Sequence, residues 1–168
     1  MKYIVPIFLT VTVFIMMFSC NGKQENDKSK EAVGPDGWLK GSDTEKFKTI
    51  AGQLRGFDAT MVEVGYRYQE LYWAGQDENW DYASYQVEKI ETTLKNGFEP
   101  RPKREKSGIH FLHYVLPELK KTIESRDTTS FNKGFVMLTS NCNSCHTMEK
   151  VPFLTVKVPT ERQSPIRK

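Results

Sequence analysis

In the first half of the chain, apolar residues recur every three or four positions, and this spacing constrains the fold more than any other feature. An α-helix has about 3.6 residues per turn, so the pattern places these side chains on one face of a bundle helix. Ser42 and Glu45 form a capping-box start, and Gly75 lies near the expected end. The spacing predicts a helix over residues 43–75. Its apolar positions are Phe47, Ile50, Leu54, Phe57, Met61, Val64, Tyr68 and Leu71.

Three later segments repeat this spacing. The second helix should start after the cap residue Asn79 and end near Gly97. The third follows two prolines and can be capped by Ser107, while Pro117 should kink or split it. The fourth follows Asp127 and Thr128, either of which can cap it, and places two cysteines in the apolar rhythm. We therefore predict an all-α fold, an antiparallel four-helix bundle. The apolar positions are Trp80, Ala83, Val87, Ile90 and Leu94, then Ile109, Leu112, Leu116, Leu119 and Ile123, then Phe131, Phe135, Leu138, Cys142 and Cys145.

The chain ends on a different pattern. Residues 151–159 contain two prolines and a short apolar alternation, which predicts an extended strap across the bundle rather than another helix. With 168 residues and 38% hydrophobic residues, the chain has enough material for one modest core. We expect a helical domain over residues 43–150 and an extended tail over residues 151–168.

The start of the chain is typical of an exported protein. Lys2 precedes an apolar run, and residues 1–19 are predicted to be a cleaved signal peptide. The sequence Met17-Phe18-Ser19-Cys20 resembles the lipobox of bacterial lipoproteins, which implies a lipid on Cys20. The polar residues that follow favour a flexible linker over residues 20–42. We expect a domain on the periplasmic side of the bacterial cell envelope, anchored by lipid to a membrane.

The remaining two cysteines lie together in Cys142-Asn143-Ser144-Cys145-His146. C-x-x-C-H is the pattern of covalent haem c attachment. Two cysteines three apart on a helix share a face, so both thiols can form thioethers with the two vinyl groups of one porphyrin. The next residue, His146, can then bind the iron. We therefore predict one covalently bound haem c per chain.

Three other interpretations of the motif stay open. Cys142 and Cys145 could form a redox dithiol, although such motifs usually lie at a helix N-terminus. A zinc site would need a fourth ligand, for which His110 and His113 are the remaining histidines. A structural disulfide is the third alternative, and a haem-free binding lipoprotein would be the corresponding function.

With its helices and C-x-x-C-H motif, the segment of residues 43–150 resembles the class II c-type cytochromes, the cytochrome c′ group. These are antiparallel four-helix bundles whose motif lies late in the last helix. The resemblance implies that the distal haem face comes from the first helix. There, a methionine gives a six-coordinate electron carrier and an apolar residue leaves the iron open to NO or CO. It also implies that Lys150, four positions after His146, lies near the haem propionates.

The residue opposite His146 depends on how the first and fourth helices are aligned. In one register His146 faces about Phe57, one turn from Met61, and in the other it faces residues 46–50. Met61 is therefore a candidate sixth ligand, with a core methionine as the alternative, and His113 is a candidate for bis-histidine ligation. The candidate distal face consists of Ile50, Leu54 and Phe57.

These features predict a monohaem c-type cytochrome for electron transfer, with a five-coordinate haem protein that binds a small gas as the alternative. The formal net charge of +3 is too small to indicate nucleic-acid binding. The basic stretch from Arg101 to Lys106 is a candidate docking surface for an acidic redox partner. The oligomeric state, including a dimer, stays open. The sequence contains no assembled nucleophile, carboxylate pair or phosphate loop, so we do not expect an enzyme.

Overall fold

The computed structural model describes residues 31–54 and 56–163. The chain divides into two compact units, one ending at Gln53 and one beginning at Leu54, and each is described by itself. The second is called the helical unit below. The predicted signal peptide and Cys20 lie outside the described residues. None of the described helices combines the length and the apolar character that crossing a membrane would require.

The first unit contains a short 3₁₀ turn, η2 (Pro35–Gly37), and the helix α2 (Asp43–Gln53). Val33 and Leu39 form an isolated antiparallel bridge around η2, with N···O distances of 2.9 and 3.0 Å. The predicted capping box is confirmed: the backbone N–H of Ser42 donates to Glu45 Oε2 at 2.7 Å. The described part of the predicted linker therefore has local structure of its own.

The prediction of one helix over residues 43–75 is wrong. The helix α2 ends at Gln53, and a second helix, α3 (Phe57–Gln76), begins after Gly56. Gly52 and Gly56 flank the break, and each glycine costs a helix about 1 kcal/mol relative to alanine. The apolar spacing continues across this segment without interruption, so it does not reveal the break in the helix.

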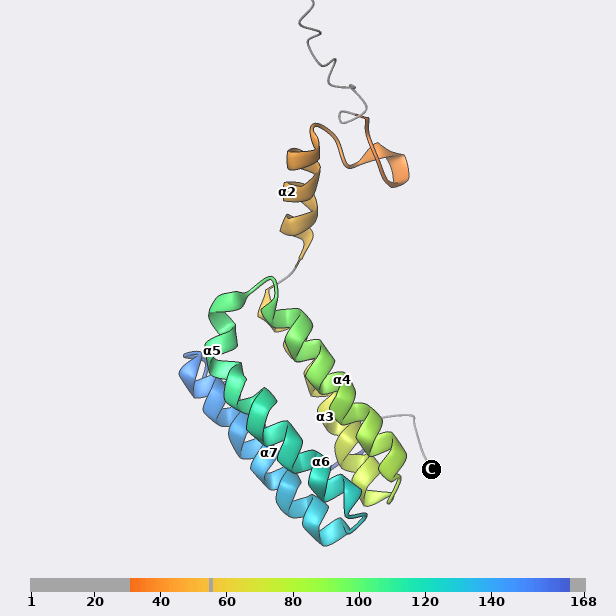
Figure 1. Ribbon diagram of the computed structural model, residues 1–168, viewed down its shortest axis with the longest axis vertical. Helices are drawn as coiled ribbons and strands as arrows, with labels where there is room; N and C mark the ends of the chain where they lie inside the picture. The colour runs from red at the N-terminus through yellow and green to blue at the C-terminus, as the bar shows by residue number, and fades with distance from the viewer. Residues whose placement is uncertain (1–30, 55, 164–168) are drawn as a thin grey trace, which may run out of the picture. The chain divides into compact units, whose positions relative to one another are not determined.

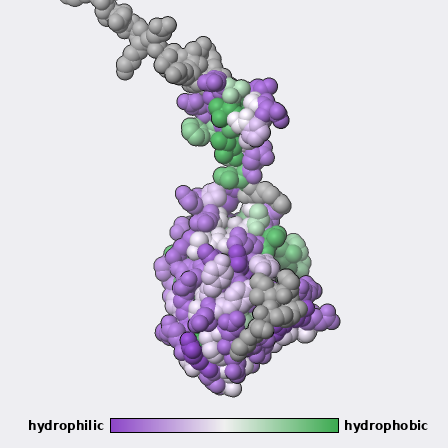
Figure 2. Space-filling model, turned by 90° about the vertical axis from the view of Figure 1, so that its right-hand side faces the viewer, coloured by the Kyte–Doolittle hydropathy of each residue, from purple (hydrophilic) through white to green (hydrophobic). Residues whose placement is uncertain are grey.

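The apolar face of α2 is exposed to solvent. Phe47 is 70% exposed and Ile50 is 40% exposed. In Figure 2 the hydrophobic side chains of α2 are visible in green, whereas the face of the helical unit that is shown is mostly hydrophilic. The three-and-four spacing in this segment thus marks an amphipathic helix whose apolar side chains are not part of the buried core.

The helical unit is all-α in its described residues, as predicted. α5, η3 and α6 follow one another without a break and run in one direction, whereas α3, α4, this run and α7 alternate in direction and are joined by short connections (Figure 1). Contacts between α3 and α4, α4 and α6, α6 and α7, and α3 and α7 close the arrangement around a common core. The elements are α3, α4 (Trp80–Phe98), α5 (Pro102–His110), the π-helical segment η3 (Phe111–Val115), α6 (Leu116–Glu124) and α7 (Thr128–Met148).

Local signals explain two of the helix starts. Asn79 precedes α4, and its side chain accepts a hydrogen bond from the backbone N–H of Tyr82 at 3.3 Å. Asp127 precedes α7 and accepts from the backbone N–H of Ser130 at 2.7 Å. Both side chains satisfy N–H groups that a helix leaves without internal partners, and both caps were predicted.

The third predicted helix differs from expectation at its start and on its face. It begins at Pro102 rather than at Ser107, because proline suits the first turn of a helix. The segment η3 lies just before Pro117, whose missing N–H removes one helical hydrogen bond. The wider π turn rotates the apolar face, so Phe111 is buried and Ile109 is 50% exposed.

The core is formed by tightly packed apolar side chains from α3, α4, η3, α6 and α7. Phe131 and Phe135 of α7 are almost fully buried, and Phe135 packs against the Tyr68 ring with centroids 4.6 Å apart. The spacing of α7 predicted these two positions. The other largely buried members include Leu71, Ala83, Val87, Ile90, Val115, Leu116, Leu119, Ile123 and Leu138.

Residues 151–163, called the strap below, form neither helix nor strand. Asn143 of α7 bonds to the backbone of Val156, and the Tyr68 hydroxyl of α3 donates to the carbonyl of Lys157 at 3.2 Å. Val156 and Val158 pack against the core. The strap therefore contacts both α7 and α3.

Candidate functional site

The start of α3, the end of α4, the start of α5 and the end of α7 meet at the same end of the helical unit, because neighbouring helices run in opposite directions. A cavity of about 350 Å³ lies there. This volume is in the usual range for pockets that bind small molecules and cofactors. The residues that line the cavity are Gly56, Phe57, Asp58, Met61, Val64, Leu94, Phe98, Arg104, Gly108, Phe111, Cys142, Cys145, His146, Glu149, Val151 and Leu154.

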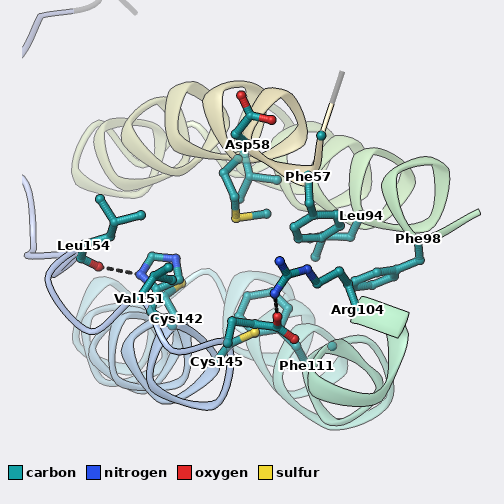
Figure 3. Close-up of a pocket in the computed structure, with 16 residues that line it drawn as sticks. Phe57, Asp58, Leu94, Phe98, Arg104, Phe111, Cys142, Cys145, Val151 and Leu154 are labelled. Atoms are coloured by element: carbon teal, nitrogen blue, oxygen red, sulfur yellow. Dashed lines mark hydrogen bonds and ion pairs between the residues drawn. The ribbon is translucent and has the colours of Figure 1, made fainter. Parts of the chain in front are cut away.

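All three chemically active residues of the C-x-x-C-H motif line this cavity. Cys142 and Cys145 are partly buried, and both thiols are free. In Figure 3, these two cysteines come from one helix, α7, and Phe57 lies on the opposite side, on α3. The apolar rhythm of the fourth helix correctly placed both thiols toward the interior.

The thiol of Cys142 lies in a buried environment. Burial raises the pKa of Cys142 to about 12, and the neighbouring Cys145 adds to the rise. The thiol is therefore protonated at neutral pH. Reactive dithiols are found where the thiolate is stabilised and the pKa lowered, so this environment argues against a redox dithiol.

His146 is held by one specific hydrogen bond. Its Nδ1 atom lies 2.5 Å from the carbonyl oxygen of Leu154, in the strap. A carbonyl only accepts hydrogen bonds, so Nδ1 must carry the proton and Nε2 keeps its lone pair. A histidine that binds a metal through one nitrogen commonly donates the other N–H to a backbone carbonyl in this way. The imidazole thus has the tautomer that an Nε2 ligand needs.

One edge of the cavity is polar. Arg104 of α5 forms an ion pair with Glu149, which also accepts a hydrogen bond from the Ser107 hydroxyl. Figure 3 shows the Arg104 side chain reaching into this edge. Lys150 is exposed, has a left-handed φ of 62°, and stands outside the set of lining residues. The sequence indicates only a docking role for Arg104, because 45 positions separate it from Glu149 and no motif links them.

Only some of the residues predicted for the distal side of the haem line the cavity. Met61 and Phe57 line the cavity. Leu54 is 51% exposed and lines a separate polar groove between α3 and α4. Ile50 belongs to α2, in the other unit. His113 is exposed on η3.

Several cavity residues carried no recognisable signal in the sequence. Phe98 and Phe111 come from the ends of two different elements, and Phe98 packs closely on Gly108: a Cβ built there would lie 2.0 Å from its ring. Glycine is thus required at this wall of the cavity. A side chain's place in a wall shared by four elements depends on tertiary packing, which local periodicity does not encode.

The predicted docking stretch, Arg101 to Lys106, forms the start of α5 beside the cavity. Lys103 and Lys106 are exposed, whereas Arg101 donates to the carbonyl of Leu54 at 2.8 Å. With Arg104 at the cavity edge, this stretch brings basic side chains next to the motif. The arrangement joins two features that are far apart in the sequence.

No known family model, curated protein or solved structure matches this chain. The site is therefore interpreted from the chemistry of its own residues. Within residues 31–54 and 56–163, no group of three or more His, Cys, Asp or Glu side chains is placed to hold a metal ion.

Proposed function

We propose that the helical unit is a four-helix bundle similar to the class II c-type cytochromes, and that it carries one covalent haem c for electron transfer. One observation carries this proposal: Cys142, Cys145 and His146 line a single, largely apolar cavity with Met61 of the opposite helix. An apolar cavity with a few placed polar groups is the usual form of a cofactor site.

The two thiols fit covalent attachment. Each S–H can add across one vinyl group, with sulfur bonding to one carbon and the hydrogen going to the other. The addition needs no oxidant or reductant. Both thiols are free and lie on the cavity side of α7, one helical turn apart. These are the donors that the C-x-x-C-H motif should present.

His146 fits the role of the iron ligand, because Leu154 fixes its tautomer with Nε2 unprotonated. When bound, the haem supplies a one-electron Fe(III)/Fe(II) couple. Met61 is the proposed sixth ligand, since its thioether comes from the helix opposite His146 and lines the same cavity. Histidine–methionine ligation is typical of electron carriers.

The polar edge can receive the haem propionates. Arg104 lines the cavity and can pair its guanidinium with a propionate. Its present partner Glu149 would then keep the hydrogen bond from Ser107 and bind water in place of Arg104. Lys150 remains a predicted second cation, from the resemblance alone.

The proposed setting rests on Cys20 and on two exposed lysines of α5. A lipid on Cys20 would hold the domain at a membrane on the periplasmic side of the bacterial envelope. An acidic redox protein would dock at the exposed lysines Lys103 and Lys106, close to the haem edge at Arg104. Short distance between docking surface and haem suits electron transfer.

The test is expression of the exported protein together with a cytochrome c maturation system. We expect haem that stays with the chain on a denaturing gel, and a sharp low-spin reduced spectrum that CO does not change. Broad high-spin bands that shift with CO would contradict electron transfer and favour the gas-binding alternative. Absence of covalent haem in the parent would overturn the proposal. The variant with Cys142→Ser and Cys145→Ser is the control that should lose covalent haem.

A further inference from the structure

We infer that Asn143 is a positioning residue for His146, and that it acts through strap residues 154–156. This inference rests on the proposed function. Asn143 occupies the first variable position of the C-x-x-C-H motif, between the two cysteines. Nothing in the motif itself calls for asparagine there.

The side chain of Asn143 binds the strap at two points. Its Nδ2 donates to the carbonyl of Val156 at 2.9 Å, and its Oδ1 accepts from the backbone N–H of Val156 at 2.7 Å. Both polar groups of the Asn143 side chain are thus paired with the backbone of one residue, Val156, whose N–H and C=O belong to two successive peptide groups. Two hydrogen bonds fix the direction of the strap backbone as well as its distance from α7.

The fixed residue is close in the chain to the histidine's partner. Leu154 precedes Val156 by two positions. Because one residue spans at most about 3.5 Å, the Leu154 carbonyl must stay near Val156 once Asn143 holds Val156 in place. On the other side, Val151 N–H donates to the carbonyl of His146 at 2.8 Å, and Leu154 N–H donates to Val151 at 3.0 Å. The Leu154 carbonyl is therefore held between two anchors on α7.

This geometry determines how strongly His146 Nε2 can donate to a metal. The Leu154 carbonyl draws on the Nδ1 proton and orients the ring, which makes Nε2 a stronger donor. A stronger donor stabilises the ferric state and lowers the reduction potential. Loss of the two hydrogen bonds from Asn143 to Val156 should free the strap and weaken the hydrogen bond between His146 Nδ1 and the Leu154 carbonyl. The reduction potential of the haem should therefore rise.

The motif provides a matched control. Ser144 is the second variable residue, and its hydroxyl donates only to the carbonyl of Ser140 within α7, at 3.0 Å, on the exposed side of the helix. Ser144→Ala changes the same motif and the same helix without touching the strap. Asn143→Asp is an intermediate variant, because it keeps an acceptor for Val156 N–H and loses the donor.

The experiment uses holoprotein in a Met61→Ala background, so that no methionine occupies the sixth position. Resonance Raman gives the Fe–His stretching frequency, and a spectroelectrochemical titration gives the reduction potential. We expect Asn143→Ala to lower the stretching frequency and shift the potential to more positive values. Asn143→Asp should give a smaller shift in both quantities, and Ser144→Ala no shift.

Failure of the positioning role of Asn143 can be distinguished from failure of the proposed function. If the parent carries covalent haem and Asn143→Ala matches Ser144→Ala in both measurements, the positioning role is overturned and the proposed function stands. If the parent carries no covalent haem, the proposed function fails and the inference fails with it. Should Asn143→Ala fold poorly, the comparison of Asn143→Asp with Ser144→Ala decides by the same criteria.

Discussion

Asp77 and Arg162 are joined by two charge-assisted hydrogen bonds, of 2.6 and 2.5 Å, although 85 positions separate them in the chain. The Arg162 guanidinium also lies over the Trp73 ring, 4.8 Å from its centroid. Asp77 directly follows α3, at the end opposite the cavity. The strap is thus also attached near its far end, away from its contact with His146.

The first prediction concerns this attachment. Arg162→Ala removes two partly buried hydrogen bonds and the contact with Trp73, so the free energy of unfolding should fall by about 1–3 kcal/mol. Urea unfolding of the haem-free protein measures it. Arg126→Ala is the control, because its 3.4 Å ion pair with Asp81 is exposed and should contribute much less. Equal effects of the two substitutions would contradict an anchored strap.

The second prediction compares two glycines of α3. A Cβ at Gly75 would lie 2.1 Å from the Phe131 ring, so Gly75→Ala should destabilise the haem-free protein by about 1–3 kcal/mol through overpacking. At Gly65, apart from its own helix backbone, no heavy atom of the described chain lies within 4 Å of such a Cβ. Gly65→Ala should therefore stabilise the helix by about 0.5–1 kcal/mol.

Thermal and urea unfolding of both glycine variants provide the measurement. If Gly75→Ala proves as stable as Gly65→Ala, the close packing of α3 on α7 at Phe131 is not present in solution.

Elements with strong local signals could be predicted from the sequence. The starts of α4 and α7 follow from the caps Asn79 and Asp127, whose side chains pair with backbone groups three residues away. The placement of Cys142 and Cys145 on the inner face of α7 follows from helical spacing alone. In each case the deciding interaction lies within one or two helical turns.

Breaks within helices and contacts between distant segments could not be predicted from the apolar spacing. The break at Gly56 leaves the apolar spacing intact, and the π turn before Pro117 shifts the buried face by a residue. The bond from His146 to Leu154 requires the strap to fold back on α7. The break and the π turn are departures from a regular helix that the spacing does not record. The contact with Leu154 depends on which elements meet, and that information is absent from any single segment of sequence.

The third prediction concerns the sixth ligand. Met61→Ala in the haem-loaded protein should convert a low-spin spectrum into a high-spin one and allow CO to bind, because it removes the thioether on the α3 side of the cavity. Met148→Ala is the matched control, since Met148 is 59% exposed and outside the cavity lining. Absorption spectra of both variants provide the readout. An unchanged spectrum in Met61→Ala would rule out Met61 as the ligand.

The last prediction uses the raised pKa of Cys142, about 12 in the folded haem-free chain against an ordinary value of 9.0. Between these values the folded state holds a proton that the unfolded state has released. The free energy of unfolding should therefore fall as the pH rises through this window. Tyr68, whose pKa burial raises to about 12, contributes in the same direction.

Urea unfolding of the reduced, haem-free protein at several pH values from neutral to alkaline measures this slope. Cys142→Ala should make the slope shallower and leave the part due to Tyr68, whereas Tyr68→Phe should leave the part due to Cys142. In the haem-loaded protein the Cys142 sulfur would be a thioether, which cannot ionise, so its share of the slope should vanish. A slope in holoprotein as steep as in the haem-free chain would contradict the combination of a buried Cys142 thiol in the haem-free chain and a thioether at Cys142 in the holoprotein.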